Sequence, residues 1–285
     1  MDRIREGVKN FRERVFPEYR QLFEGLADGQ SPAVMFITCA DSRVDPSLIT
    51  SSPPGSLFVL RNAGNLIPTR SHDIGGEIAT VDYALRTLRV RHVVICGHSD
   101  CGAMTHLMQA KGSSAPVDRW LAHAQRVRMS TRKQHPAARG AELVNAAANF
   151  NVLQQLDNLR TWPFVMKAVR SGDLTLHGWM YDIATGTILA YEAASGGFGP
   201  LADVDDEREL LDDLGTWTAV LHSAGATPDA VADAIIKVTS WPRREVMQLF
   251  GDVPLTLLEG LNHIEAEVVE TWLTDAGASL RLQRE

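Results

Sequence analysis

Three short apolar runs stand out in the first two thirds of the chain. None of them has a helical period: AVMFITC (33–39), LFVLRN (57–62) and HVVICGH (92–98). Continuous apolar runs of this length are typical of strands buried on both faces. Helical spacing of apolar residues separates or follows these runs, at 74–89, 118–130 and 141–170. The alternation predicts an α/β fold, with a mainly parallel β-sheet flanked by helices.

The two ends of this region have patterns of their own. Apolar residues over 3–16 fall on one face of a helix, which Pro17 should interrupt. LTLHGWMYD (174–182) and ILAYE (188–192) are separated by a turn and predict a hairpin that closes the sheet.

A second set of elements follows an acidic stretch. DVDDERELLDD (203–213) comes after a glycine-rich segment and predicts a solvated linker or the start of a helix. We therefore expect a first domain over 1–200, an acidic linker over 201–213 and a small α+β domain over 214–285. In the last domain the expected order is strand, helix, helix, strand, helix, strand, at 217–222, 228–239, 243–250, 253–258, 262–275 and 279–283.

Composition and charge exclude several classes of protein. The chain has 285 residues, 45% of them hydrophobic and 22% charged, which is ordinary globular usage. No run of 18 apolar residues is present, so no spanning helix is expected. Three cysteines are too few for a disulfide framework, and the first thirty residues lack the apolar stretch of a secretory signal, so we expect a cytoplasmic protein.

The distribution of charge also bears on partners. Residues 1–202 hold 22 basic and 18 acidic side chains, and everything after them is net acidic. No block carries the basic excess that a phosphate-neutralising surface needs. Neither nucleic acid nor a membrane is expected as a partner.

Candidate metal ligands follow two of the predicted strands. The first strand runs into Cys39-Ala-Asp41-Ser-Arg43, and the third runs into His98-Ser-Asp-Cys101-Gly. The carboxyl ends of strands in open α/β sheets meet in one crevice, so both segments could converge there. Two thiolates and an imidazole are typical zinc ligands, and three protein ligands with one open position are the arrangement of a catalytic zinc.

The fourth zinc position has one nearby candidate. Asp41 could occupy it, or could be held by Arg43 in a forked ion pair and accept a hydrogen bond from a zinc-bound water. Cys96 lies inside the apolar strand and is interpreted as a core thiol.

At these residues the sequence resembles the β-class carbonic anhydrases, over about residues 30–195. The matching motifs occur in order along the chain: GQSP (29–32), ITCADSRVDP (37–46), PGSLFVLRNAGN (54–65), VICGHSDCGAM (94–104), NVLQQLDNLRTWPFV (151–165) and LHGWMYD (176–182). The resemblance implies that Cys39, His98 and Cys101 hold Zn²⁺ and that Asp41 and Arg43 form the catalytic dyad. It implies a lyase that hydrates carbon dioxide reversibly to bicarbonate and a proton, by attack of zinc-bound hydroxide.

The resemblance also implies a substrate pocket and an assembly. Gln30, Phe58, Tyr83 and Gly102 correspond to substrate-binding positions, some of which the family takes from a neighbouring subunit. The N-terminal helix would clasp a homodimer or a higher even oligomer. One departure concerns a bicarbonate-inhibition pocket found in some members, because Phe36 stands where those members have tryptophan.

Two other functions are compatible with this sequence. Relatives on the same scaffold hydrolyse carbon disulfide or carbonyl sulfide. A zinc-stabilised binding module without catalysis would use the same ligands.

The C-terminal domain resembles a different family. WTAVLHSAGA, REVMQLFGDVPLTLLEGL and EAEVVETWLTDAGASLRLQ are similar to the C-terminal domain of the bacterial ribosomal stalk protein. SWPRREVMQL (240–249) lacks the lysine pattern with which that domain binds translation factors, so we expect an appended module with an unknown protein partner.

Overall fold

The computed structural model describes residues 1–70, 75–109, 115–201, 217–239, 241–251, 253–261 and 263–284. The predicted acidic linker falls outside the described residues except for Leu201. No helix in the described part of the chain is long and apolar enough to cross a membrane.

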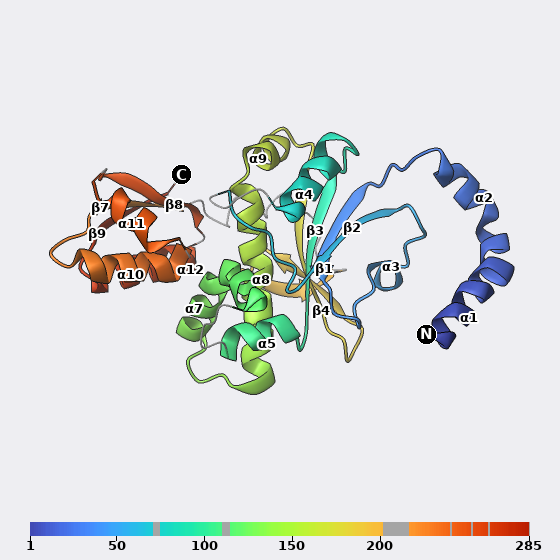
Figure 1. Cartoon of the computed structure of the whole chain (residues 1–285), viewed down its shortest axis with the longest axis horizontal. Helices are drawn as coiled ribbons and strands as arrows, with labels where there is room; N and C mark the ends of the chain where they lie inside the picture. The colour runs from blue at the N-terminus through green and yellow to red at the C-terminus, as the bar shows by residue number, and fades with distance from the viewer. Residues whose placement is uncertain are drawn as a thin grey trace.

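A six-stranded sheet forms the centre of the first two thirds of the chain (Figure 1). Its spatial order is β2-β1-β3-β4-β5-β6, with neighbours parallel from β2 to β4 and antiparallel from β4 to β6. The strands are β1 (Val34–Cys39), β2 (Leu57–Asn62), β3 (His92–His98), β4 (Thr175–Tyr181), β5 (Ile188–Glu192) and β6 (Gly197–Pro200). The predicted mainly parallel sheet is confirmed. Strand β6 was not predicted: it extends the sheet beyond the expected hairpin, pairs with β5 through its backbone and needs no apolar pattern.

Helices cover the sheet and supply most of its core. They are α3 (Pro46–Ile49), α4 (Gly76–Arg86), α5 (Gly102–Gln109), α6 (Pro116–Leu121), α7 (Gln125–Gln134), α8 (Gly140–Arg160) and α9 (Pro163–Arg170). The long helix α8 packs across β3 and β4, where Gly97 and Gly178 let the backbones approach Val152 closely. Both glycines therefore fix the distance between this helix and the strands.

The N-terminal helix is longer than predicted. It runs through α1 (Asp2–Asn10), a π-helical turn η1 (Phe11–Val15) and α2 (Phe16–Ala27). Pro17 does not interrupt it, because the proline lies in the first turn of α2, directly after the wider π turn. The helix extends away from the rest of the molecule (Figure 1), and neither α1 nor α2 has a buried residue.

The C-terminal part is a separate small α+β unit, as predicted. Its antiparallel sheet has the order β8-β7-β9, with β7 (Trp217–Ser223), β8 (Leu255–Leu261) and β9 (Ser279–Arg284). Helices α10 (Pro228–Thr239), α11 (Arg243–Leu249) and α12 (His263–Asp275) pack on it around their own apolar core. All six elements occur in the expected order.

Candidate metal centre

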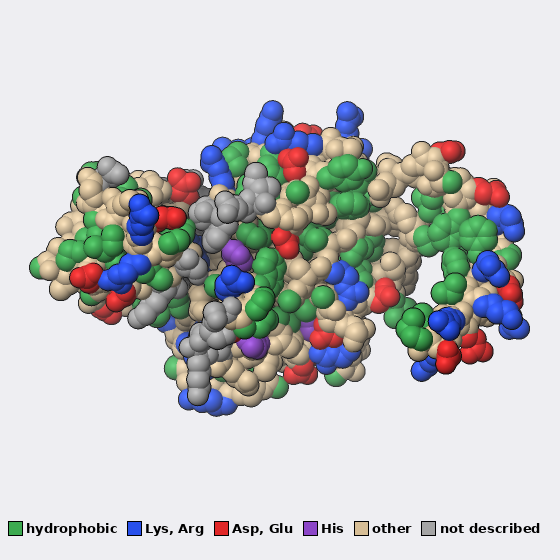
Figure 2. All heavy atoms as spheres, viewed as in Figure 1, with side chains coloured by type: hydrophobic (Ala, Val, Ile, Leu, Met, Phe, Trp, Pro, Cys, Tyr) green, Lys and Arg blue, Asp and Glu red, His purple; other side chains and the backbone are tan. Residues whose placement is uncertain are grey.

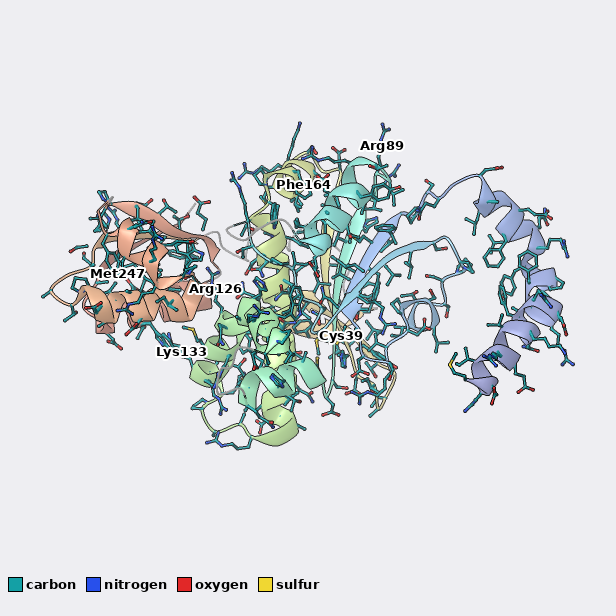
Figure 3. The ribbon with its side chains drawn as sticks, in the orientation of Figure 1. Cys39, Arg89, Arg126, Lys133, Phe164 and Met247 are labelled. Atoms are coloured by element: carbon teal, nitrogen blue, oxygen red, sulfur yellow. The ribbon has the colours of Figure 1, made fainter. Side chains whose placement is uncertain are left out.

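Three predicted zinc ligands come together at the carboxyl ends of neighbouring strands. Cys39 ends β1, His98 ends β3, and Cys101 lies just before α5. Their ligand atoms all lie within 4.8 Å of one another, and the three residues are buried. Figure 3 marks Cys39 at the end of its strand, in the interior of the molecule. The parallel pairing of β1 with β3 produces this convergence.

The backbone around the group orients each donor atom. The Gly64 N–H donates to Cys39 Sγ at 3.4 Å, and the His98 Nδ1 is 2.9 Å from the Ser99 carbonyl oxygen. A carbonyl partner on Nδ1 makes Nε2 the nitrogen that is left for a metal. The His98 Nε2 atom is buried and has no hydrogen-bond partner among the described residues.

The two thiols at the centre favour a single negative charge. A hydrogen bond from Cys101 lowers the pKa of Cys39 to about 4, against the opposing effect of burial. The same contact, together with burial, raises the pKa of Cys101. One thiolate, one thiol and one free imidazole nitrogen are a donor set that zinc would complete, so these residues fit that metal.

Asp41 and Arg43 form a tight ion pair beside the three donors. Arg43 donates from Nε to Asp41 Oδ1 at 2.9 Å, from Nη2 to Oδ2 at 2.8 Å, and from its backbone N–H to Oδ1 at 3.0 Å. Asp41 Oδ2 lies 3.9 Å from His98 Nε2. The Arg43 hydrogen bonds hold the pKa of the Asp41 carboxyl well below its usual range. The carboxylate is thus ionised, directed by guanidinium and close to the metal-binding atoms.

A second arginine, Arg61, was not predicted as part of the site. It donates from Nε to the Cys39 carbonyl oxygen at 3.1 Å and from Nη2 to the Asp41 carbonyl oxygen at 2.7 Å. Arg61 therefore fixes the backbone that carries both a metal ligand and the dyad carboxylate. Its register opposite Thr38 on the neighbouring parallel strand is the signal that could have indicated this role.

A row of buried amides on α8 holds the segment that follows β2. Asn151 donates to the Gly64 carbonyl oxygen at 2.8 Å, Asn158 donates to the Ile67 carbonyl oxygen at 2.7 Å, and Gln155 accepts from the Ile67 N–H at 2.7 Å. Gly64 in turn contacts Cys39 Sγ. Through Gly64 these amides support the backbone next to the metal centre. In the sequence they stood out only as part of a motif that matches the family.

Of the predicted substrate-binding residues, Gly102 lies beside the metal donors, and Gln30, Phe58 and Tyr83 lie away from them. Gly102 begins α5 next to Cys101, and a Cβ there would meet nothing within 4 Å. Phe58 and Tyr83 have ring centroids 6.0 Å apart, but Phe58 lies four residues before the end of β2, or about 13 Å along the strand. Gln30 is exposed and precedes the amino end of β1. A single chain therefore does not bring Gln30, Phe58 or Tyr83 to the cysteines.

Cys96 lies outside the group, as expected, and so does Phe36. Burial raises the pKa of Cys96 to about 12, which is consistent with an inert core thiol. Phe36 packs edge-on against Trp179 at a centroid distance of 5.9 Å, within a small apolar cluster that also includes Cys96.

The known proteins that resemble this chain in sequence and fold are carbonic anhydrases. The carbonic anhydrase family matches residues 34–188. A carbonic anhydrase from a Synechocystis species is 44% identical over 195 residues, covering 67% of this chain and 71% of its own length. The Pseudomonas aeruginosa carbonic anhydrase is 44% identical over 213 residues, covering 73% and 94%. Among solved structures, the β-carbonic anhydrase CcaA has a TM-score of 0.68 at 43% identity, covering 70% of this chain and 98% of its own.

These matches define a zinc-dependent lyase of the β class. The chain belongs to the carbonic anhydrase family, whose members hydrate carbon dioxide reversibly to bicarbonate and a proton. The predicted enzyme class, reaction and metal are confirmed at the level of this family. The family match ends before the C-terminal sheet, so it gives no identity to that part.

Proposed function

We propose that this chain hydrates carbon dioxide at the centre formed by Cys39, His98 and Cys101. The observation that carries the proposal is the buried donor set, with His98 Nε2 turned toward two sulfurs and lacking any other partner among the described residues. Zinc held there would lower the pKa of a water molecule and so supply the nucleophile for carbon dioxide. The side chains of the protein position the donor atoms and handle the proton that this water releases.

We assign the transfer of this proton to Asp41. Its carboxylate has both oxygens engaged by Arg43, which keeps it ionised and fixes its direction. Asp41 Oδ2 is close enough to the metal-binding atoms to accept a hydrogen bond from a water at the open position. The alternative prediction, in which Asp41 itself fills the fourth position, requires that the Arg43 fork opens.

A second copy of the chain would complete the substrate pocket. Gln30, Phe58 and Tyr83 lie toward the amino ends of β1 and β2, whereas the metal donors lie at the carboxyl ends. A twofold assembly can bring the first group of one protomer to the second group of another. Solved relatives from Sordaria macrospora are tetrameric β-carbonic anhydrases. We therefore place Gln30 in the site of a partner protomer.

The N-terminal helix supplies apolar surface for such an assembly. Ile4, Val8, Phe11 and Tyr19 are between 43% and 64% exposed, and the helix that carries them extends away from its own chain. Apolar surface of this kind is typical of an interface between subunits. The helix is thus a candidate clasp between protomers, as the family resemblance implies.

The remaining assignments concern the C-terminal unit and location. Its order of strands and helices supports the likeness to the ribosomal stalk domain, with an unidentified protein as partner. The three free cysteines support a reducing, cytoplasmic environment.

The test combines metal content with turnover. Stopped-flow hydration of carbon dioxide is measured on protein whose zinc content is determined in the same batch, then after chelation and again after zinc is restored. Activity that disappears and returns with zinc supports the proposal. A zinc-loaded protein that hydrates no carbon dioxide would be a binding module and would overturn it.

A further inference from the structure

The peptide unit that joins Ala63 to Gly64 is hydrogen-bonded on both sides. Its N–H belongs to Gly64 and donates to Cys39 Sγ at 3.4 Å. Its carbonyl oxygen belongs to Ala63 and accepts from Trp120 Nε1 at 2.8 Å. Trp120 lies in α6 and is half-buried against the apolar core of the first domain. One peptide unit therefore links the Trp120 indole to a sulfur of the metal centre.

The surroundings of Gly64 fix the direction of this N–H. Gly64 has a φ of +84°, in the left-handed region that residues with a side chain rarely adopt. A Cβ there would lie 3.2 Å from Ala103 Cβ and 3.2 Å from Met104 Cε, both in α5. The Gly64 carbonyl oxygen accepts from Asn151 Nδ2 at 2.8 Å, so α8 holds the next peptide. Hydrogen bonds from two helices and close contact with a third therefore direct the N–H toward the sulfur.

Hydrogen bonds in series polarise one another. A donor on the carbonyl oxygen draws electrons from the peptide and makes its N–H a stronger donor, by about 10–30% per bond. A stronger N–H···S bond withdraws charge from the sulfur that would bind zinc. Groups that hydrogen-bond around a metal ligand orient the ligand and tune the metal. The Trp120 indole can therefore act on Cys39 without touching it.

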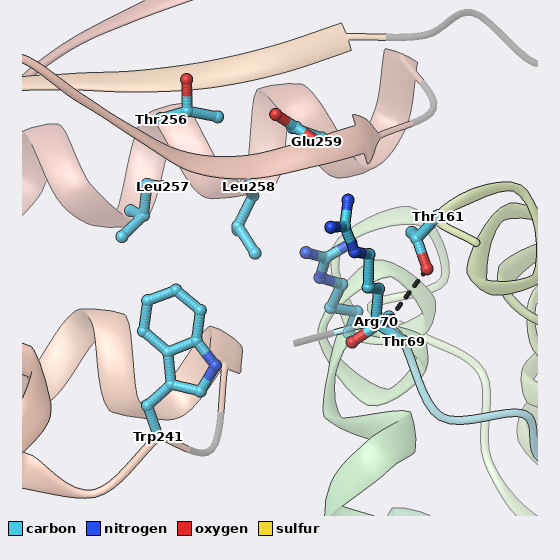
Figure 4. A pocket seen from close by; sticks show the side chains of 9 residues that line it. Thr69, Arg70, Thr161, Trp241, Thr256, Leu257, Leu258 and Glu259 are labelled. Atoms are coloured by element: carbon cyan, nitrogen blue, oxygen red, sulfur yellow. Dashed lines mark hydrogen bonds between the residues drawn. The ribbon is translucent and has the colours of Figure 1, made fainter. Parts of the chain in front are cut away.

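A second tryptophan makes the same kind of contact further along this segment. Trp162 Nε1 donates to the Pro68 carbonyl oxygen at 3.0 Å, and Trp162 also belongs to the core of the first domain. The next residues, Thr69 and Arg70, line a cavity against β8 (Figure 4). The cavity lies where the first domain and the C-terminal unit adjoin (Figure 2), and it shares no residue with the metal centre. Trp162 therefore offers an indole-to-carbonyl bond that leads to no metal ligand.

We propose that Trp120 is a positioning residue of the metal centre and acts on the Cys39 sulfur through the Ala63–Gly64 peptide. Its indole N–H strengthens the Gly64 hydrogen bond to the sulfur and holds the loop in position for zinc. This inference rests on the metal centre of the proposed function. It adds a residue from α6, a helix that supplies none of the three donors.

The experiment compares Trp120→Phe with Trp162→Phe in the full chain. Each variant keeps an aromatic ring and loses one indole N–H that is bonded to a carbonyl oxygen. Three quantities are measured: the free energy of unfolding, the affinity for zinc in competition with a chelator, and the wavelength of sulfur-to-cobalt charge transfer after Co²⁺ replaces zinc. If far-UV circular dichroism shows that Trp120→Phe is unfolded, β-(3-benzothienyl)alanine is placed at position 120 instead, because it keeps the bicyclic shape and lacks the N–H.

We expect both variants to lose stability, because each leaves a carbonyl oxygen without its indole donor. Only Trp120→Phe should weaken zinc binding, by about threefold or more, since groups that hold metal ligands contribute to metal affinity. It should also move the charge-transfer band to longer wavelength, because a sulfur with a weaker hydrogen bond gives up charge to the metal at lower energy. Trp162→Phe should leave both metal readouts at their wild-type values.

Three results would overturn the inference. In the first, Trp120→Phe keeps the wild-type zinc affinity and charge-transfer band. In the second, both variants change these readouts equally, which would show a structural role only. In the third, zinc affinity falls but the band does not move, so Trp120 does not act on the sulfur. A wild-type chain that binds neither metal would overturn the proposed metal centre as well, so that failure is distinguishable from the other three.

Discussion

Replacement of Gly97 by alanine tests how closely β3 packs on α8 next to a metal ligand. A Cβ at this position would lie 2.7 Å from Met180 Sδ and 2.8 Å from Val152 Cγ2. The Met180 side chain is flexible and can move, but Val152 is β-branched and confined to one rotamer on a helix. Overpacking of this kind costs about 1–3 kcal/mol. The lost freedom of the unfolded chain returns only about 0.4–1 kcal/mol.

The net expectation for Gly97→Ala is a loss of about 0.5–2 kcal/mol in the free energy of unfolding. Because His98 follows directly, zinc content should fall as well. Equilibrium unfolding in guanidinium chloride measures the first effect, and elemental analysis measures the second. Gly25→Ala is the matched control: Gly25 is an exposed helical glycine whose added Cβ would meet nothing within 4 Å, so this variant should be slightly more stable than wild type.

A second substitution separates steric overlap from the remaining effects of the added methyl group. Val152→Ala removes the methyl group that the new Cβ would meet, so the double variant should be more stable than the sum of the two single effects by about 1 kcal/mol. If Gly97→Ala unfolds at the wild-type midpoint, or if the two effects simply add, contact with α8 does not limit position 97.

Three further outcomes follow from the metal centre. Asp41→Asn should lower carbon dioxide hydration by about 10²-fold or more while zinc is retained. The control is Asp173→Asn, which changes a surface carboxylate far along the chain and should not lower hydration. Equal loss of hydration in both variants would remove Asp41 from the proton path. Cys101→Ser should lose zinc in elemental analysis, whereas Cys96→Ala should keep it, since Cys96 is outside the donor group. A hydrogen bond from Cys101 lowers the pKa of Cys39 to about 4, whereas the pKa of Cys101 is raised, so the cysteines of the metal-free chain should release about one proton per zinc bound at pH 7. Calorimetry in buffers of different ionisation enthalpy measures this number, and a value well away from one would contradict the assignment of one thiolate and one thiol.

The sequence predicted those parts of the fold in which apolar pattern decides the structure. The bounds of β2 and β5 agree with the expected 57–62 and 188–192, because short, mostly apolar runs between turn residues leave little choice of element. The predicted break at Pro17 was wrong and strand β6 was not predicted, for a common reason. Each depends on backbone hydrogen bonds, a π turn in one case and a strand partner in the other, and side-chain pattern does not encode them.

The metal ligands were predictable because thiol and imidazole groups at the ends of neighbouring strands are the donors that zinc prefers. Arg61 was not, because its partners are carbonyl oxygens of Cys39 and Asp41, and any residue could supply those. Gln30 was found through family motifs, yet its distance from the cysteines along β1 emerges only when the strand is built. Side chains that bind backbone carbonyls are found only once the register of the strands is known.

The segment from Asn62 to Arg70 contacts two distant parts of the molecule. Gly64 contacts the sulfur of Cys39 at one end, Arg70 at the other end lines a cavity together with residues of β8, and amides of α8 bind the peptides between them. A single inserted or deleted residue would displace a metal ligand's neighbour and a guanidinium together, whatever its side chain. The contacts at its two ends therefore constrain the length of this stretch, independently of the side chains between them.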